Sequence, residues 1–486
     1  MNKMNKILCT AVSALLVAGS TLPMTACNKK GSTITTGDVD VVAYDGSKVT
    51  VNFYHTMGSK LRNVLDAWIP DFNEMYPNIK INHQSYGDYP GVRDQISKEL
   101  TAKNAPSLAY CYADHVALYN NSKAVLILDD YMNSDLTVER ADGTTETVGF
   151  TDEQMADFIP AYLEEGRVFG DGKTYSLPYV KSTEVLYYNK TYFEANNYTV
   201  PTTWAEMEAL CKTIKEKEPN NIPLGYDSEA NWFITMAKQK GADYTSSTPG
   251  SKFIFDNEDN WETVEMMKSW YDKGYLITEE TYTSYTSELF TELDPTKTKT
   301  YMTIGSSAGA SYQTPSVGEG EELTYGFEVG VAQIPQLDVN NPKVISQGPS
   351  LCIFKKSNEQ EVAAAWLFAK WMATYVPLQA QFSSSSGYAP VIQSVESNPV
   401  YAEFLAGANG YDNVQATCVK MNIALKNATF TSPAFNGSSE SRDWVGTLVV
   451  KCLENTPKDK TPEGLRSFVQ GYFDEAIEDL EYFYGA

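Results

Sequence analysis

Histidine and cysteine are scarce in this chain of 486 residues, and basic residues are outnumbered by acidic ones. The three histidines, at positions 55, 83 and 115, are too widely spaced to form an HExxH metal site. Seven cysteines without a CxxC pair indicate neither a disulfide framework nor a zinc site. We therefore expect no bound metal and no cofactor.

Long apolar runs are also lacking. The apolar run near the N-terminus, residues 7–19, is too short for a transmembrane helix, which needs about 20 residues. It follows two lysines and has the layout of a secretory signal. The run leads to MTAC, ending at Cys27, which resembles the lipobox of bacterial lipoproteins with methionine where leucine is preferred. The sequence therefore predicts a lipoprotein signal peptide over residues 1–26 and acylation of Cys27, with palmitate among its lipids. An ordinary signal peptide with a chance cysteine is the alternative.

The segment after this cysteine is polar. Residues 27–47 are rich in Gly, Ser and Thr, which predicts a flexible tether. Because two acyl chains give stable anchoring, we expect the protein on the extracellular face of the cell membrane, held by lipid alone. Cleavage removes two lysines and no acids, so the net charge changes from −24 to −26. Such an acidic surface argues against nucleic acid and anionic lipid headgroups as partners.

The order of apolar patterns predicts an α/β fold. Residues 49–54 alternate between apolar and polar side chains, as in a half-buried strand. Residues 61–75 repeat apolar side chains every three or four positions, as in a helix. Strand and helix patterns alternate further along the chain, which predicts a largely parallel sheet. The mature chain of about 460 residues exceeds what one hydrophobic core usually holds, so two lobes are expected.

Several short segments occur in the order typical of one protein family. They are VNFYHTMG, YGDYPGV, NAPSLAYCYADHVALY, LPYVKSTEVLYYNK, YMTIGSSAGAS, ISQGPSLCIF and SSSSGYAPV. With this set the chain resembles the extracellular solute-binding proteins of ABC importers. The likeness is to the carbohydrate group, which includes the maltose-binding and glycerol-3-phosphate-binding proteins. It covers roughly residues 48–475, and its specificity comes from the ordered set rather than from any single motif.

The resemblance implies a periplasmic-binding-protein-like fold with two lobes and a ligand cleft between them. The lobes would be joined by crossover strands near residues 175–182, near residues 331–335 and at the GYAPV segment. Lobe one would comprise residues 48–178 plus 335–387, and lobe two residues 179–334 plus 388–486. The implied function is a monomer that captures a sugar or small oligosaccharide and delivers it to an ABC transporter permease. Binding of a glycerol-phosphate-like polyol phosphate is the alternative.

A sugar-like ligand needs flat aromatic faces for its C–H surfaces and paired polar groups for its hydroxyls. The resemblance, together with the segments that follow the strands, indicates the following candidate ligand-binding residues: Tyr89, Asp114, Ser182, Trp232, Ser306, Ser307, Gly348, Tyr388 and Arg442. In this interpretation Gly348 permits close backbone approach, and Tyr388 faces the ligand from a hinge at the cleft floor. Arg442 could fork onto a carboxylate or phosphate, or donate to sugar hydroxyls.

Four of these candidates also have a structural interpretation. Trp232 could belong to the core, and Asp114 could cap a helix. Tyr388 could lie in a plain surface loop. Arg442 could pair with a neighbouring acid, Glu440 or Asp443, on the surface.

One motif favours catalysis. Residues 305–309, GSSAG, match the GxSxG nucleophile elbow of serine hydrolases. That elbow requires a histidine later in the chain, and all three histidines precede it. A glycosidase would need two opposed carboxylates, and no pattern marks such a pair. We therefore expect a binding protein and no enzyme, with a surface glycosidase or adhesin as the remaining alternative.

Overall fold

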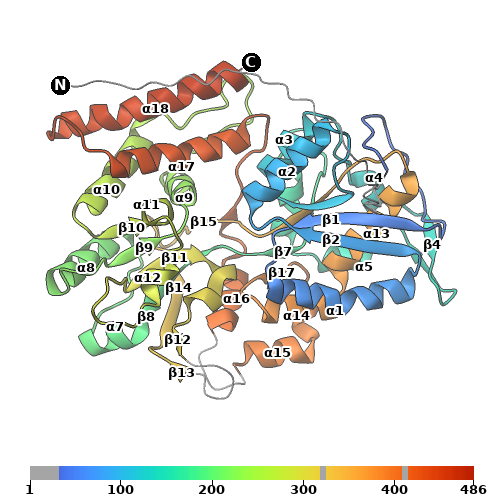
Figure 1. Cartoon of the computed structure of the whole chain (residues 1–486), viewed down its shortest axis with the longest axis horizontal. Coiled ribbons are helices and arrows are strands. Elements are labelled where there is room, and N and C mark those ends of the chain that lie inside the picture. Colours follow the sequence, from blue (N-terminus) through green and yellow to red (C-terminus); the bar gives the residue numbers. More distant parts are fainter. Residues whose placement is uncertain (1–31, 318–323, 408–413, 486) are drawn as a thin grey trace, which may run out of the picture. The chain divides into compact units, whose positions relative to one another are not determined.

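The computed structural model describes residues 32–317, 324–407 and 414–485. Within them the chain forms two α/β lobes, each built on a five-stranded mixed sheet covered by helices (Figure 1). The predicted two-lobed α/β fold is thereby confirmed. The predicted signal peptide, residues 1–26, and the predicted lipid-bearing Cys27 lie outside the described residues.

The sheet of lobe one has the strand order β2-β1-β3-β16-β6. Its strands are β1 (Val49–His55), β2 (Ile79–Ser85), β3 (Leu108–Cys111), β16 (Ser350–Ile353) and β6 (Leu177–Pro178). Strand β1 pairs in parallel with β2 and β3, whereas β16 is antiparallel to β3 and β6. The covering helices are α1 (Ser59–Met75), α2 (Tyr89–Thr101), α3 (Ala113–Asn120), α13 (Glu359–Thr374) and α14 (Val376–Ser384). Because the parallel strands end at one edge, α2 and α3 begin side by side there.

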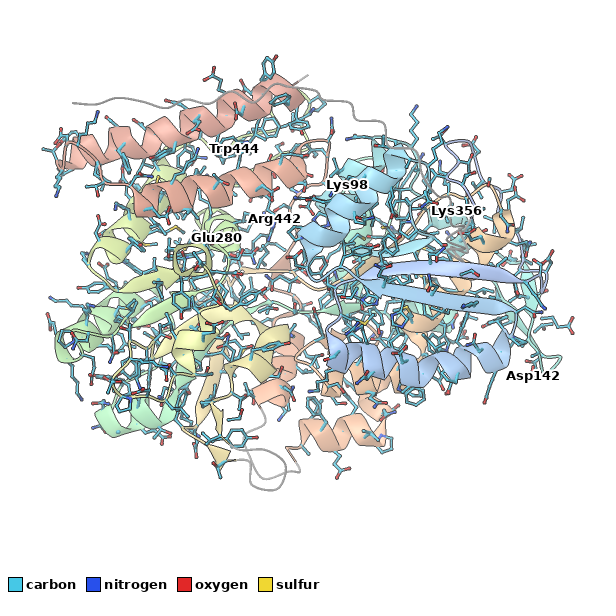
Figure 2. All side chains as sticks on the ribbon, in the orientation of Figure 1. Lys98, Asp142, Glu280, Lys356, Arg442 and Trp444 are labelled. Carbon is cyan, nitrogen blue, oxygen red and sulfur yellow. The ribbon has the colours of Figure 1, made fainter. Side chains whose placement is uncertain are left out.

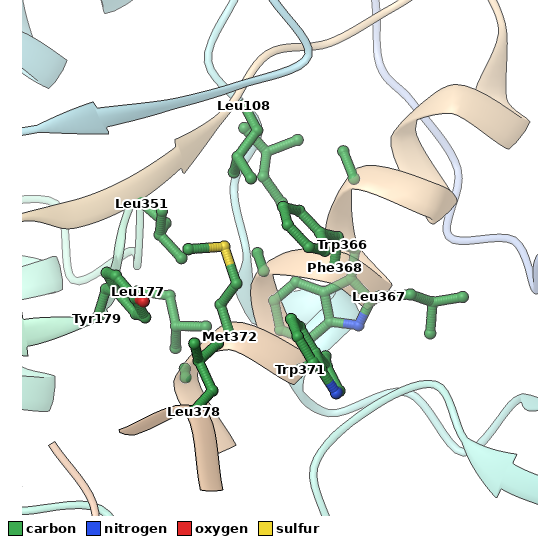
Figure 3. Close-up of a cluster of buried hydrophobic side chains, with 14 of the residues drawn as sticks. Leu108, Leu177, Tyr179, Leu351, Trp366, Leu367, Phe368, Trp371, Met372 and Leu378 are labelled. Carbon is green, nitrogen blue, oxygen red and sulfur yellow. The ribbon is translucent and has the colours of Figure 1, made fainter. Parts of the chain in front are cut away.

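The core of lobe one is rich in aromatic rings. Helix α13 is buried along nearly its whole length, and Figure 3 shows its Trp366, Phe368, Trp371 and Met372 gathered with leucines of the sheet. The Trp366 indole donates to the Val148 carbonyl at 2.7 Å, so its one polar atom is satisfied inside the core. Large rings buried in this way contribute strongly to the energetics of the core.

The sheet of lobe two has the strand order β10-β9-β11-β8-β14. Its strands are β10 (Leu276–Thr278), β9 (Leu224–Tyr226), β11 (Met302–Ser306), β8 (Glu184–Asn189) and β14 (Val329–Gln333). The main helices are α8 (Trp204–Lys217), α9 (Glu229–Lys240), α10 (Glu258–Asp272), α16 (Val414–Leu425), α17 (Ser438–Glu454) and α18 (Pro462–Tyr484). The N-terminal end of α17 faces lobe one (Figure 1).

Smaller elements fill the connections. In lobe one they are α4 (Asp129–Met132), the hairpin β4 (Thr137–Glu139) and β5 (Thr145–Thr147), α5 (Asp152–Asp157), α6 (Pro160–Glu164) and η1 (Glu165–Arg167). In lobe two they are α7 (Lys190–Asn196), α11 (Glu279–Tyr282), α12 (Ser287–Phe290), η2 (Ser307–Gln313), β12 (Ser316–Val317) and β13 (Thr324–Tyr325). Across the described residues, no helix combines the length and the apolar character needed to cross a membrane.

Short strand pairs connect the lobes. Strand β7 (Val180–Lys181) follows β6 and pairs antiparallel with β17 (Ala389–Pro390) of the GYAPV segment. Beside this pair, a side chain at Gly387 would collide with the Ser307 carbonyl oxygen, 1.7 Å from the position of its Cβ. The GYAPV segment is therefore a tightly packed junction, which explains the glycine.

Two predicted lobe boundaries are wrong. Residues 335–345 stay with lobe two, because Val344 and Ile345 are buried in its core and β15 (Val344–Ile345) pairs with β18 (Thr429–Phe430). The chain returns to lobe one only at 346–349. Residues 389–405 stay with lobe one, where η4 (Gln393–Ser397) and α15 (Pro399–Leu405) pack, and lobe two resumes with α16. In both places the segment belongs to the lobe in whose core its apolar side chains are buried, and the family pattern did not indicate which side chains these are.

The predicted tether is also wrong for its described part. Residues 32–46 pack along lobe one as a strap. The backbone N–H and the hydroxyl of Ser32 both donate to Glu361 at 2.7 Å, and Ile34 forms a bridge with Lys356. Ile34 and Tyr44 are each only 7 % exposed. These two apolar anchors in a polar segment fix the strap, although its composition is that of a flexible linker.

Candidate functional site

A cavity lies between the lobes. Lobe one contributes Tyr112 and Asp114, the connecting segments contribute Lys181, Gln347 and Gly348, and lobe two contributes Tyr244, Thr431 and Arg442. Its free volume is about 60 Å³, whereas pockets for drug-sized ligands enclose about 300–1000 Å³. The space between the lobes is thus too small for a drug-sized ligand.

Polar contacts beside the cavity join the two lobes. Arg93 of α2 pairs with Asp443 of α17 at 2.8 Å, and Asn121 donates to Asn436 at 2.6 Å. Arg93 also donates to Ser439 at 3.2 Å. These bonds hold the N-terminal end of α17 against lobe one.

Three of the predicted ligand-binding residues line the cavity: Asp114, Gly348 and Arg442. Gly348 has a φ of +91°, and a Cβ there would lie 2.5 Å from the Val180 carbonyl oxygen. Only glycine lets the two connecting segments come so close. The close approach predicted at Gly348 is therefore made to the protein's own backbone.

Several buried oxygen atoms around the cavity have no hydrogen-bond partner within the described residues. They are Oδ2 of Asp114, Oε1 of Gln347 and Oγ1 of Thr431. The second carboxylate oxygen of Asp114 accepts from the His115 backbone N–H at 3.0 Å, in the first turn of α3. Asp114 thus serves the helix with one oxygen and presents the other to the cavity. Because an unpaired buried acceptor is costly, these atoms fit a ligand that donates hydrogen bonds.

The charges around the cavity largely compensate one another. Lys181, 2 % exposed, forms an ion pair with Glu165 at 2.6 Å. Arg442, at the end of α17 that faces lobe one (Figure 2), lines the cavity together with Asp114. Two cationic and two anionic side chains therefore surround the space. This balance favours an uncharged, hydroxyl-bearing ligand over a strongly anionic one.

The predicted tyrosines lie next to the cavity without lining it. Tyr89 stacks on the cavity residue Tyr112, with ring centroids 4.0 Å apart and planes at 22°. Tyr388 is half-buried beside Tyr89, and burial raises the pKa of its hydroxyl to about 12. The aromatic faces that a sugar needs are gathered here, and ligand contact by Tyr89 and Tyr388 stays a prediction.

The predicted serines fall into two groups. Ser182 forms a backbone bridge with Gln347, and Ser306 donates to Ser182 at 3.3 Å, so both border the cavity wall. Ser307 has no exposed surface and accepts from the Thr183 N–H at 3.3 Å and from the Asn422 amide at 2.8 Å. The prediction that Ser307 contacts ligand is therefore corrected: its hydroxyl ties the connecting segment to α16.

Trp232 lies in the core of lobe two, which corrects its assignment to the cleft. Its side chain has no exposed surface and stacks on Tyr226, with ring centroids 4.7 Å apart and planes at 13°. Trp204 and Trp270 pack around it. The residue follows a strand end as cleft residues do, but α9 turns this side chain toward the other helices.

Glu165, Tyr244, Gln347 and Thr431 are among the cavity residues that no motif indicated. Gln347 adjoins the predicted Gly348, so proximity could have indicated it. The other three stand in short or irregular segments, with no periodic pattern or motif. Only the packing of the two lobes brings them together.

The histidines His55 and His83 form a hydrogen-bonded chain in lobe one. Nδ1 of His55 accepts from the Met57 N–H at 3.1 Å, so Nε2 of this neutral ring carries the proton and donates to His83 at 2.9 Å. His83 then donates to Asp66 at 2.8 Å. Burial is the main cause that lowers the pKa of His55 to about 3.

The buried neutral His55 predicts that the protein loses stability in acid. The pKa of His55 is lower in the folded protein than the value of about 6.5 in the unfolded chain. Below that value the unfolded chain binds a proton that the folded protein does not, so the stability present above pH 6.5 is lost as pH falls. We expect His55 alone to lower the free energy of unfolding by about 2 kcal/mol between pH 7.5 and 5. Urea unfolding at both pH values measures it. His55→Gln should remove that part of the pH dependence, and an unchanged pH dependence would contradict the assignment.

A comparison with protein families decides the identity. The family model of the bacterial extracellular solute-binding proteins matches residues 67–406. The chain belongs to this family. The resemblance inferred from the ordered motifs is thereby confirmed, and the family implies a location outside the cytoplasm, extracellular or periplasmic.

Curated relatives and solved structures agree with this assignment. The sn-glycerol-3-phosphate-binding periplasmic protein UgpB of Agrobacterium fabrum is 22% identical over 363 residues, which cover 70% of this chain and 74% of UgpB. Among solved structures, UgpB from Mycobacterium tuberculosis in complex with glycerophosphocholine has a TM-score of 0.67 at 16% identity, covering 90% of this chain and 98% of that one. The GacH receptor of Streptomyces glaucescens, solved unliganded and with acarbose, has a TM-score of 0.65 at 16% identity, covering 88% and 98%. These solute-binding proteins share the two-lobed fold.

Proposed function

We propose that this solute-binding protein captures a neutral sugar or small oligosaccharide between its lobes, as a monomer, and delivers it to the permease of an ABC transporter. The observation that carries the proposal is the set of unpartnered buried acceptors at Asp114, Gln347 and Thr431. Sugar hydroxyls supply the donors that these atoms require. The compensated charges of the cavity and the stacked Tyr89 and Tyr112 support the same ligand class.

A polyol phosphate is the second candidate ligand. Arg442 lines the cavity, and several curated relatives are named for binding sn-glycerol 3-phosphate. A guanidinium forks readily onto a phosphate. Asp114 in the same cavity would repel that group, so we rank it below a neutral sugar.

The ligand class is tested by a thermal-shift screen. Maltose, glucose, sn-glycerol 3-phosphate and a tripeptide serve as probes. A probe at 100 times its dissociation constant stabilises the protein by about 2.7 kcal/mol, so the melting temperature should rise with a neutral sugar. Asp114→Asn and Arg442→Ala should weaken that response. A shift with sn-glycerol 3-phosphate alone would establish the second candidate, and a shift with the peptide alone would overturn the substrate class.

We further propose that ligand is bound without turnover. The serine of the GxSxG match is Ser307, whose hydroxyl is fully buried and accepts two hydrogen bonds. It is therefore not placed to attack a substrate. Saturable binding without product formation is the expected result with any sugar that the screen identifies, and hydrolysis of that sugar would contradict it.

Lipid anchoring is proposed from the sequence motif at Cys27. Ser32, the first described residue of the strap, follows Cys27 by five positions in the sequence. A tagged protein should partition with the membrane, and Cys27→Ser should release it or leave it uncleaved. Fractionation and immunoblotting measure this. Normal processing and membrane retention of Cys27→Ser would refute the lipobox assignment.

A further inference from the structure

Arg442 reaches the cavity from lobe two, and its guanidinium is held from behind. Nη2 of Arg442 donates to Oδ1 of Asn231, which is 4 % exposed and lies in the first turn of α9. The backbone N–H of Asn231 donates in turn to Ser228, which caps this helix, at 3.2 Å. Asn231 is therefore fixed by its own helix and presents its amide oxygen to the arginine.

Behind Asn231 lies a buried carboxyl. Glu184, at the start of β8, is 1 % exposed, and its Oε2 accepts from the Tyr226 hydroxyl at 2.7 Å. Its Oε1 has no well-formed hydrogen bond within the described residues. Burial raises the pKa of Glu184 to about 8, while Tyr226, Asn231 and Arg442 oppose this rise and Asp227 adds to it. Glu184 is thus a buried carboxyl next to both the Asn231 amide and the arginine.

The series ends in the core of lobe two. Tyr226, which donates to Glu184, stacks on Trp232, and Trp232 packs between other indoles. Each member has no more than 4 % exposure apart from the arginine itself. A side chain such as arginine loses much rotamer entropy when it is held still, so a rigid support prepares it for ligand before binding.

We propose that Asn231 and Glu184 are positioning residues that hold the Arg442 guanidinium toward the cavity, so that part of the ligand specificity is set inside lobe two. Neither residue lines the cavity. The proposal rests on the proposed binding function only for its affinity readout.

Arginine side-chain NMR tests the positioning without any ligand. The chain has six arginines, so 15N-arginine labelling gives at most six Nε–H signals, and Arg442→Lys identifies that of Arg442. We expect this signal to be dispersed in the wild type and in Glu184→Gln, which keeps hydrogen-bonding oxygen and nitrogen atoms. It should collapse to the position of a free arginine in Asn231→Ala and Glu184→Ala.

The control is Asn260→Ala. Asn260 is an equally buried asparagine of lobe two, but its amide donates to the Ala242 and Phe255 carbonyls, away from Arg442. This variant should lower stability and leave the Arg442 signal in place. Tyr226→Phe, which keeps the stacked ring and removes only the hydroxyl, serves if an alanine variant does not fold. It should broaden or shift the Arg442 signal.

Affinity is the second readout, with maltose as the neutral probe and sn-glycerol 3-phosphate as the anionic one. Asn231→Ala should weaken binding of whichever probe the wild type binds by about 10- to 100-fold, as expected for loss of an arginine hydrogen bond, and Glu184→Gln should restore most of what Glu184→Ala loses. If neither probe binds the wild type, the proposed ligand class fails while the NMR result still decides the positioning. An unchanged Arg442 signal in Asn231→Ala would overturn the inference.

Discussion

Trp232→Ala is expected to lower the free energy of unfolding by about 3–5 kcal/mol, the usual cost of deleting a large aromatic side chain from a core. The ring has no exposed surface and packs on Tyr226, Trp204 and Trp270, so its removal leaves a cavity that the surrounding rings cannot easily fill. Thermal and urea unfolding of the variant measure the loss. A cleft tryptophan would show the opposite pattern, with lost affinity and little change in stability.

Trp261→Ala is the matched control for this prediction. Trp261 lies on α10 of the same lobe, is only half-buried, and donates to Asp256 at 2.7 Å. Its removal should cost clearly less stability than the removal of Trp232. Equal losses for the two variants would show that Trp232 is not the centre of the lobe-two core.

Gly348→Ala is expected to lower the free energy of unfolding by about 3–5 kcal/mol, because strain and overlap add. The φ of +91° is unfavourable for alanine, and the new Cβ would lie 2.5 Å from the Val180 carbonyl oxygen. Since Gly348 also lines the cavity, we expect binding of any solute to weaken. Urea unfolding and calorimetric titration measure the two effects.

Gly309→Ala provides the control for the glycine. A Cβ at Gly309 meets no atom within 4 Å, and its φ is not in the left-handed region. The free energy of unfolding of Gly309→Ala should stay within about 0.5–1 kcal/mol of the wild-type value. If Gly348→Ala behaves like Gly309→Ala, the connecting segments are looser than their close packing indicates.

The described lobes also suggest how ligand enters. The cavity holds about 60 Å³, and bonds such as Arg93 to Asp443 join the two lobes. We therefore expect the lobes to separate and close again around a ligand, as in hinge motions of two-lobed proteins. The paired segments β7 and β17 lie at the connection, where a few residues can absorb the rotation.

The sequence by itself determined the fold class, the family and three of the cavity residues. Apolar periodicity indicates strands and helices because side-chain direction follows the backbone period, and this holds without knowledge of the neighbours. The ordered motifs identified the family, and position in the family pattern indicated candidate binding residues. Asp114, Gly348 and Arg442 were found in this way.

The tertiary structure alone decided which side chains face the cavity and which lobe each connection joins. Trp232 follows a strand end as Asp114 does, but helix α9 turns it into the core, where burial of its large ring is most favourable. Ile34 and Tyr44 dock a segment whose composition is that of a tether. Glu165, Gln347 and Thr431 meet only because three distant segments fold against one another. Burial depends on what packs from elsewhere in the chain, and a local pattern does not contain that information.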